Sequence, residues 1–241
     1  QIGSEEVTNG NFSQEGSEQI TNGSFDTDTD WTKGTGWSIS GGLASCDGTQ
    51  VGNTNLTQGG IFSSLGNKNI KISFTVSNYS AGSVRFISGN GALTHTAVST
   101  NGVVTIYFNV GANTATTFNI QGDANFVGSI DNVSVKEVGQ NWTLEDVWTI
   151  GDGVANGNGA NGFSEELLQG SILTVGKIYS ITYEIKNYVS GSIKTRKPNT
   201  SSVSEDGVYT EIAEATSSSL IFTGTNFIGS ITNISVKEVG Q

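Results

Sequence analysis

The segment that ends the chain, Ile228–Gln241, is a near copy of Val127–Gln140, which lies 101 residues earlier (241 − 140). The copies differ by two exchanges of valine for isoleucine and by Thr232 in place of Asp131. A segment repeated this closely marks the closing strand of a repeated module. The chain therefore contains two copies of one structural unit, and the remaining segments can be assigned to one copy or the other.

Two further segments recur in the same order. Trp31–Ala44 matches Trp142–Ala155 at an offset of 111 (142 − 31), with both tryptophans of a W-x5-W spacing kept. Ile70–Tyr79 matches Tyr179–Tyr188, and both alternate apolar and polar residues as half-buried strands do. A chain of 241 residues has room for two domains of about 100–120 residues. We therefore predict an all-β fold of two tandem antiparallel jelly-roll β-sandwiches.

A smaller repeat lies near the start of the chain, where Glu6–Phe12 and Glu18–Phe25 both end in Asn-Gly-x-Phe, 13 residues apart (25 − 12). Because Asn-Gly is a turn signal, each copy predicts a short strand, a turn and an aromatic plug. The second copy opens module one, predicted over residues 18–140. Module two, predicted over residues 141–241, lacks this opening. Residues 1–17 are therefore interpreted as a linking arm or as the remnant of a preceding repeat.

Within module two, separate strands are predicted at Ser192–Arg196, Ser219–Thr223 and Ser230–Val236. No segment sustains the 3.6-residue apolar period of a helix. The one helical candidate, Ser164–Gln169, is long enough for about one turn.

Charge and cysteine content exclude several classes of protein. The net charge is −11, with 22 acidic and 11 basic side chains, which disfavours nucleic acid and polybasic membrane binding. No apolar run approaches the roughly 18–20 residues that membrane insertion requires. Cys46 is the single cysteine, so an internal disulfide framework and a multi-thiolate metal site are excluded.

The order of motifs resembles the galactose-binding-like jelly roll of carbohydrate-binding modules. The resemblance rests on Thr21–Phe25, the W-x5-W spacing, the segment Ser38–Ala44 and the closing Ile130–Val135. The sequences of these motifs, including the Val-Lys-Glu-Val ending, also closely resemble repeats in tail-fibre and other virion-appendage proteins of bacteriophages and in secreted bacterial proteins. The resemblance covers Glu18–Gln140 and extends more loosely over module two. Because such folds carry many functions, it implies the scaffold more directly than the ligand.

The resemblance implies a structural Ca²⁺ between the opening turn and the last strand of module one. Carried over to this sequence, it points to Asn22, Asp26 and Asp131 as ligands. The alternating carboxylates of Asp26, Asp28 and Asp30 suit a cation that prefers oxygen ligands. The alternative is a solvated acidic turn. Module two has Thr232 at the position of Asp131, so a second site is not expected.

Aromatic residues are the candidates for carbohydrate binding. Trp31 and Trp142 are predicted as platforms for sugar rings, and the alternative for both is a place in the core. Tyr79 and Tyr188 each follow an asparagine at a strand end and are second-choice contacts. Corner packing is the alternative for these two tyrosines.

Catalysis is not expected. His95, the only histidine, has no recognisable triad around it, and the acidic pairs Glu145–Asp146 and Glu165–Glu166 have no counterpart in module one. We predict a non-catalytic structural or adhesive protein of a virion appendage or other extracellular assembly. It would self-associate or bind other subunits, with cell-surface glycans as further partners. The alternative is a secreted soluble carbohydrate-binding protein whose tandem modules provide avidity for polysaccharide.

Overall fold

The computed structural model describes residues 2–112, 116–145, 147–159 and 164–240. These residues form two compact units. Module one is the continuous segment Gly16–Glu137, whereas module two combines Gln1–Glu15 with Val138–Gln241. The chain therefore enters module two, leaves it to build module one, and then returns. No helix long and apolar enough to cross a membrane occurs in the described part of the chain.

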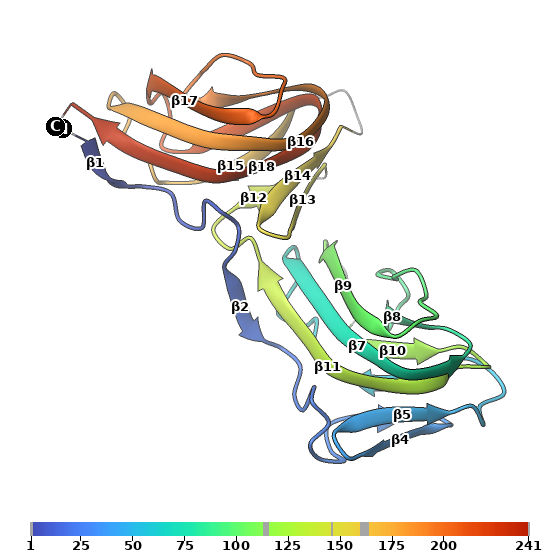
Figure 1. Ribbon diagram of the computed structural model, residues 1–241. Helices are drawn as coiled ribbons and strands as arrows, with labels where there is room; N and C mark the ends of the chain where they lie inside the picture. Colours follow the sequence, from blue (N-terminus) through green and yellow to red (C-terminus); the bar gives the residue numbers. More distant parts are fainter. Residues whose placement is uncertain (1, 113–115, 146, 160–163, 241) are drawn as a thin grey trace. The chain divides into compact units, whose positions relative to one another are not determined.

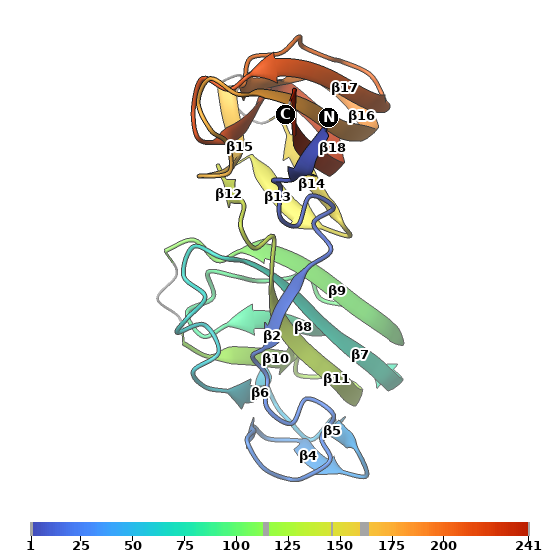
Figure 2. The ribbon, with the colours of Figure 1, turned by 90° about the vertical axis from the view of Figure 1, so that its left-hand side faces the viewer.

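Module one is a sandwich of two antiparallel sheets. Its strands are β2 (Glu15–Glu18), β3 (Thr32–Lys33), β4 (Trp37–Ser40), β5 (Leu43–Asp47), β6 (Thr54–Gln58), β7 (Asn69–Ala81), β8 (Val84–Ser88), β9 (Gly102–Asn109), β10 (Phe118–Gly122) and β11 (Val127–Val138). One sheet has the order β4-β5-β11-β7-β9, and β2 lies along β11 (Figures 1 and 2). The other has the order β3-β6-β10-β8. Two facing sheets of this kind confirm the predicted β-sandwich.

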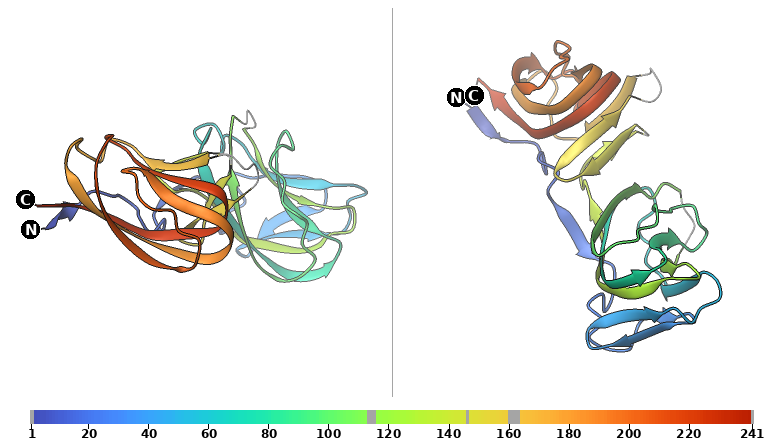
Figure 3. Two further views of the ribbon diagram at one scale, coloured as in Figure 1. Left: turned by 90° about the horizontal axis from the view of Figure 1, so that it is seen from above. Right: turned by 45° about the vertical axis from the view of Figure 1, so that its right-hand side comes forward.

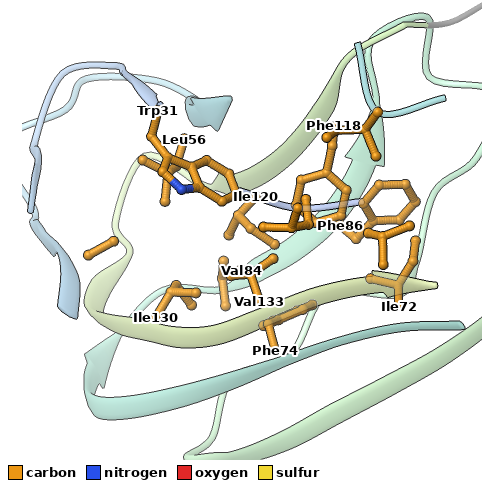
Figure 4. Packing of buried hydrophobic residues seen from close by; sticks show 14 of the residues in the cluster. Trp31, Leu56, Ile72, Phe74, Val84, Phe86, Phe118, Ile120, Ile130 and Val133 are labelled. Carbon is orange, nitrogen blue, oxygen red and sulfur yellow. The ribbon is translucent and has the colours of Figure 1, made fainter. Parts of the chain in front are cut away.

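The inward side chains of both sheets fill one hydrophobic core in module one. Alternate residues of β7, such as Ile72 and Phe74, are fully buried, as are Phe86 of β8 and Ile120 of β10. Figure 4 shows these side chains converging between the two sheets. Burial of each large apolar side chain contributes about 1.5–3 kcal/mol, which makes this layer the main source of stability.

Module two repeats the sandwich with longer strands. Its strands are β1 (Ile2–Glu5), β12 (Thr143–Leu144), β13 (Trp148–Gly151), β14 (Val154–Asn158), β15 (Ser164–Gln169), β16 (Ile178–Lys197), β17 (Gly207–Glu214) and β18 (Leu220–Val239). β16 corresponds to β7 and β8 joined, and β18 to β10 and β11 joined. Ser192–Arg196 is thus the end of β16, and Ser219–Thr223 joins Ser230–Val236 in β18. The separate strands predicted there are wrong, because irregular register between Lys186 and Ser192 bends the pair without ending it.

Ser164–Gln169 is a strand and not a helical turn. It pairs along its whole length with β18, from Ser164 opposite Thr225 to Gln169 opposite Leu220. It is the counterpart of β6 at the offset of 111 (169 − 58), and the buried Leu167 matches the buried Leu56. Cross-strand pairing therefore overrides the weak helical pattern of this segment.

The N-terminal arm is the opening segment of module two. β1 pairs antiparallel with β18, with Ile2 opposite Val239 and Glu5 opposite Lys237 (Figures 1 and 3). The following Asn-Gly-x-Phe turn ends in Phe12, which is 2% exposed. The interpretation of residues 1–17 as a linking arm or remnant is therefore wrong. The opening that seemed to be missing from module two precedes module one in the chain.

The contacts of the two openings match one for one. Phe12 packs on Trp142 with ring centroids 5.2 Å apart, and Phe25 packs on Trp31 at 5.3 Å. In both pairs the rings meet at 47°. The carboxylate of Glu5 accepts the backbone N–H of Val236 at 2.7 Å. Glu18 makes the equivalent bond in module one.

A glycine is required in both turns. A Cβ at Gly10 would lie 2.0 Å from the carbonyl oxygen of Ile234, and one at Gly23 would lie 2.0 Å from that of Val133. The same backbones form hydrogen bonds, because Ile234 and Val133 donate their N–H groups to the glycine carbonyls, both at 2.9 Å. The Asn-Gly signal in each opening is thus explained by close contact with the closing strand.

Substitution of Phe12 by alanine should destabilise module two, although 122 residues of module one separate it from Val138 (137 − 16 + 1). Loss of a buried aromatic side chain costs about 3–5 kcal/mol. We expect faster hydrogen exchange in peptides from β16 and β18, measured by mass spectrometry. Phe25→Ala is the matched control and should accelerate exchange in β7 and β11. Unchanged exchange over residues 138–241 in Phe12→Ala would show that the arm is dispensable.

Tyr183 places a hydroxyl in the core of module two without a partner. The residue is fully buried, and its oxygen has no hydrogen-bond partner among the described residues. Its ring packs edge-on against Phe222, with centroids 5.2 Å apart. Burial raises the pKa of Tyr183 above that of an exposed tyrosine. The equivalent residue in module one is Phe74, at an offset of 109 (183 − 74), which has no such polar group.

Tyr183→Phe should raise the free energy of unfolding by about 1 kcal/mol near neutral pH, because an unsatisfied buried hydroxyl is removed. The gain should grow above about pH 10. There the unfolded wild type loses the phenol proton while the folded state keeps it, so stability falls as pH rises. Urea denaturation at about pH 7 and about pH 10.5 measures both effects. Destabilisation by the variant at both pH values would contradict this account.

Candidate functional site

The two tryptophans predicted as sugar platforms are buried. Trp31 and Trp142 are each 7% exposed. Their indole N–H groups donate to the backbone carbonyls of Asn22 at 3.0 Å and of Asn9 at 3.1 Å. Figure 4 shows Trp31 within the core beside Leu56. Because stacking on a sugar requires an exposed ring face, the platform prediction is wrong and the alternative, a core role, describes both residues.

Tyr79 and Tyr188 are half-buried at equivalent corners of the two modules. Their hydroxyls donate to the carbonyls of Gly82 and Gly191, both at 2.9 Å. Both glycines have positive φ, so each tyrosine braces a tight turn three residues beyond itself. These contacts favour corner packing over the predicted contact with a sugar.

The residues predicted to bind calcium are engaged by their own loops. The amide N–H groups of Asn22 donate to the carbonyls of Thr27 at 2.7 Å and Thr29 at 3.1 Å. Asp26 accepts a hydrogen bond from the hydroxyl of Ser24 at 2.8 Å, and Asp131 accepts one from the backbone N–H of Asn132 at 2.6 Å. No group of three His, Cys, Asp or Glu side chains suited to a metal occurs among the described residues. Calcium binding by these three residues stays a prediction.

The acidic residues of module two form local pairs. Glu166 forms an ion pair with Arg196, and Glu145 accepts the backbone N–H of Glu166 at 3.0 Å. Asp146 lies outside the described residues. A glycosidase needs one carboxyl group that can donate a proton to the leaving group. The ion pair with Arg196 and the backbone bond to Glu145 give Glu166 a structural explanation.

A polar surface that the sequence did not indicate covers the sheet β3-β6-β10-β8 of module one. Every second residue of β6, β10 and β8 points away from the core, and register brings these residues into two rows. Gln121 lies between Asn55 and Arg85 in the first row, and Asn119, which is 6% exposed, lies between Thr57 and Ile87 in the second. We call Asn55, Thr57, Arg85, Asn119 and Gln121 the polar face.

Side-chain hydrogen bonds connect each row. In the first, Arg85 donates through Nε at 3.1 Å and Nη2 at 2.8 Å to Oε1 of Gln121. Nε2 of Gln121 then donates to Oδ1 of Asn55 at 3.1 Å. In the second, the hydroxyl of Thr57 donates to Oδ1 of Asn119 at 2.7 Å. The rows are thus ordered before any ligand binds, which lowers the entropy cost of binding.

Two hollows adjoin the polar face. One of about 620 Å³ is lined by Thr57 and Asn55 among others, within the volume range of ligand sites. A smaller one of about 190 Å³ is lined by Arg85, Gln121, Ser83 and Asp123. Asn53 lines both. The row Asn55–Gln121–Arg85 therefore extends from one hollow to the other.

Module two does not repeat the polar face. Glu166, Thr223 and Lys194 occupy the positions of Asn55, Gln121 and Arg85. The hydroxyl of Thr223 is buried without a hydrogen-bond partner. The two modules thus share a core and an opening but differ on this surface, which makes module two an internal control for module one.

Comparison with known proteins adds a similarity of fold. No family model and no curated protein matches the chain. Among solved structures, the chain is similar to the N-terminal CBM22-1–CBM22-2 tandem domain of Paenibacillus barcinonensis Xyn10C. The identity is 12% and the TM-score 0.40, over 95% of this chain and 99% of that one. It is also similar to the isomalto-dextranase of Arthrobacter globiformis T6 complexed with panose, at 10% identity and a TM-score of 0.26, over 81% of this chain and 36% of that one.

Proposed function

We propose that the protein is a non-catalytic glycan-binding protein of the extracellular space or of a virion surface, and that the polar face of module one contacts the glycan. The observation that carries the proposal is the ordered row Asn55–Gln121–Arg85 between two hollows. The carbohydrate-binding-module resemblance of the sequence motifs supports the same class of ligand.

The chemistry of the face suits sugars. Amide and guanidinium groups form hydrogen bonds with sugar hydroxyls, and Asn55, Gln121 and Arg85 place such groups in one row on this face. An ordered amide row also retains its geometry when water leaves, and this favours a ligand with regularly spaced hydroxyls. The open hollows suit the side of a polysaccharide chain better than a fully enclosed small molecule.

Binding by one such face should be weak. All four tryptophans are buried, with exposed fractions of 1–7%, and none adds stacking energy to a polar contact. Weak single-site binding is compatible with adhesion when several copies engage one polymer, because linked sites act at a high effective concentration. Affinity should therefore rise strongly when the protein is displayed in many copies.

The double variant Asn55→Leu/Gln121→Leu should lose at least about tenfold in affinity for its polysaccharide, because each substitution removes polar contacts and leaves the strand pairing intact. Isothermal titration against a panel of neutral and acidic polysaccharides measures the loss. Tryptophan fluorescence is a poor readout because the indoles are buried.

Thr223→Val in module two is the matched control, since Thr223 occupies the position of Gln121. It should leave glycan affinity unchanged. Equal loss in the control and in the double variant, or no binding of the wild type to any polysaccharide, would refute the assignment of the polar face.

A second function, in assembly, is favoured by the edge strands. β17 pairs only with β16, and β9 pairs only with β7, within the described residues. Both edges carry exposed apolar side chains: Val208 is 68% exposed, Ile212 is 70% exposed and Val103 is 72% exposed. Uncharged apolar side chains on an open edge favour pairing with another chain. We therefore propose that copies of this chain, or other subunits of an appendage, associate through β17.

Ile212→Lys should weaken such association, because a charge on an edge strand opposes edge-to-edge pairing. Sedimentation velocity over a range of protein concentrations should show oligomers of the wild type that dissociate in the variant. Val51→Lys is the control, as Val51 is fully exposed but lies outside the edge strands. A wild type that stays monomeric at all concentrations would exclude assembly through this edge.

A further inference from the structure

Arg85 has no acidic partner. None of the ion pairs within the described ranges includes it, and both its donor contacts go to one neutral oxygen, Oε1 of Gln121. It is half-buried and lines the smaller hollow. Acidic residues outnumber basic ones by 22 to 11 in this chain, yet no carboxylate of the described residues forms an ion pair with Arg85.

Arg85 also fixes the direction of every hydrogen bond in its row. A guanidinium group donates only, so the oxygen of the Gln121 amide must face it. The nitrogen of Gln121 consequently faces Asn55, and the oxygen of Asn55 must face Gln121. This order follows from the chemistry of arginine, whose guanidinium group has no acceptor.

The row therefore offers donors and has few acceptors left. Oε1 of Gln121 already accepts two bonds from Arg85, and Oδ1 of Asn55 accepts one from Gln121. Among the described residues, the remaining N–H groups of the guanidinium and the Nδ2 group of Asn55 make no hydrogen bond. A donor-rich row that ends in a cation is complementary to a ligand group that only accepts hydrogen bonds and carries negative charge.

Asp123 is the one acidic side chain that lines the same hollow. Its Oδ2 accepts the hydroxyl of Ser83 at 2.6 Å, and its Oδ1 accepts the backbone N–H of Asn125 at 2.9 Å. Each oxygen retains a lone pair that can accept a sugar hydroxyl. The hollow thus provides a cationic donor on one strand and an acceptor beside it, which suits a sugar ring that carries both an anionic group and hydroxyls.

We propose that the smaller hollow, with Arg85 as its central residue, recognises an anionic sugar, one that bears a carboxylate or a sulfate ester. This inference rests on the proposed glycan-binding function and narrows its ligand class. The guanidinium binds the anionic group, Asn55 and Gln121 position the adjoining ring, and Asp123 accepts ring hydroxyls. The corresponding positions of module two, with Glu166 opposite Thr223, place a carboxylate where module one has an amide and therefore do not form the same site.

Polygalacturonate and its fully methyl-esterified form test the carboxylate, because they share one backbone and differ in charge. Dextran sulfate and dextran form the equivalent pair for sulfate. Titration calorimetry on the intact chain should show at least about tenfold tighter binding to the charged member of one pair, and this preference should decrease as salt is added.

Arg85→Gln should abolish the preference for the charged polymer, and Lys194→Gln, at the equivalent position of module two, should leave it unchanged. Circular dichroism of both variants establishes that the fold is kept. Should Arg85→Gln unfold, the comparison of esterified and free polymer on the wild type still decides the question.

Five outcomes are distinguishable. A preference for polygalacturonate or for dextran sulfate that disappears in Arg85→Gln supports the proposal and identifies the anionic group. Equal binding of the charged and neutral members of both pairs overturns the anionic site and leaves glycan binding intact. Loss of the preference in Lys194→Gln as well overturns the assignment to Arg85. Absence of binding to all four polymers, with binding to another polysaccharide of the panel, overturns the anionic site alone, and absence of binding to the whole panel overturns the proposed function as well.

Discussion

The fold of each module depends on one interaction, the insertion of an Asn-Gly-x-Phe turn between the closing strand and a tryptophan. The asparagine carbonyl accepts the indole N–H, the phenylalanine packs on the indole ring, and the glycine lies against the closing backbone. Hydrogen bonding and aromatic packing are satisfied together, so the tryptophan can be buried without an unpaired donor. This explains why Trp31 and Trp142 belong to the core.

The two modules keep the interior and differ on the surface. The turn, its tryptophan and the glutamines Gln58 and Gln169 that bond the arm backbone are the same in both. The outward residues of the sheet that carries the polar face differ between the two modules. An interior is constrained by close packing, whereas outward positions of the same strands can change with little cost in stability. Divergence on this face is compatible with a proposed site in module one that module two does not share.

Sequence periodicity was sufficient for the fold class, because alternation and internal repetition report directly on strands and modules. It failed for the arm, since the sequence shows that Phe12 resembles Phe25 but not which closing strand receives it. It also failed for the site. Asn55, Arg85 and Gln121 lie in three separate short segments, and only the pairing register places them in one row. Each residue alone is an ordinary outward polar residue of a strand. The sequence-based prediction of a carbohydrate site therefore rested on aromatic residues instead.

The order of the arm along the chain has a consequence for biosynthesis. β1 is translated before module one, whereas β18, the strand with which it pairs, is complete only after Val239 has been added. At typical rates of about 5–20 residues per second, the arm spends roughly 10–50 seconds on the ribosome without its partner strand. Module one is fully translated well before then and can fold while β1 is still unpaired. Module two therefore completes its fold with a strand that was translated before module one, and any factor that binds the arm during translation would delay module two alone.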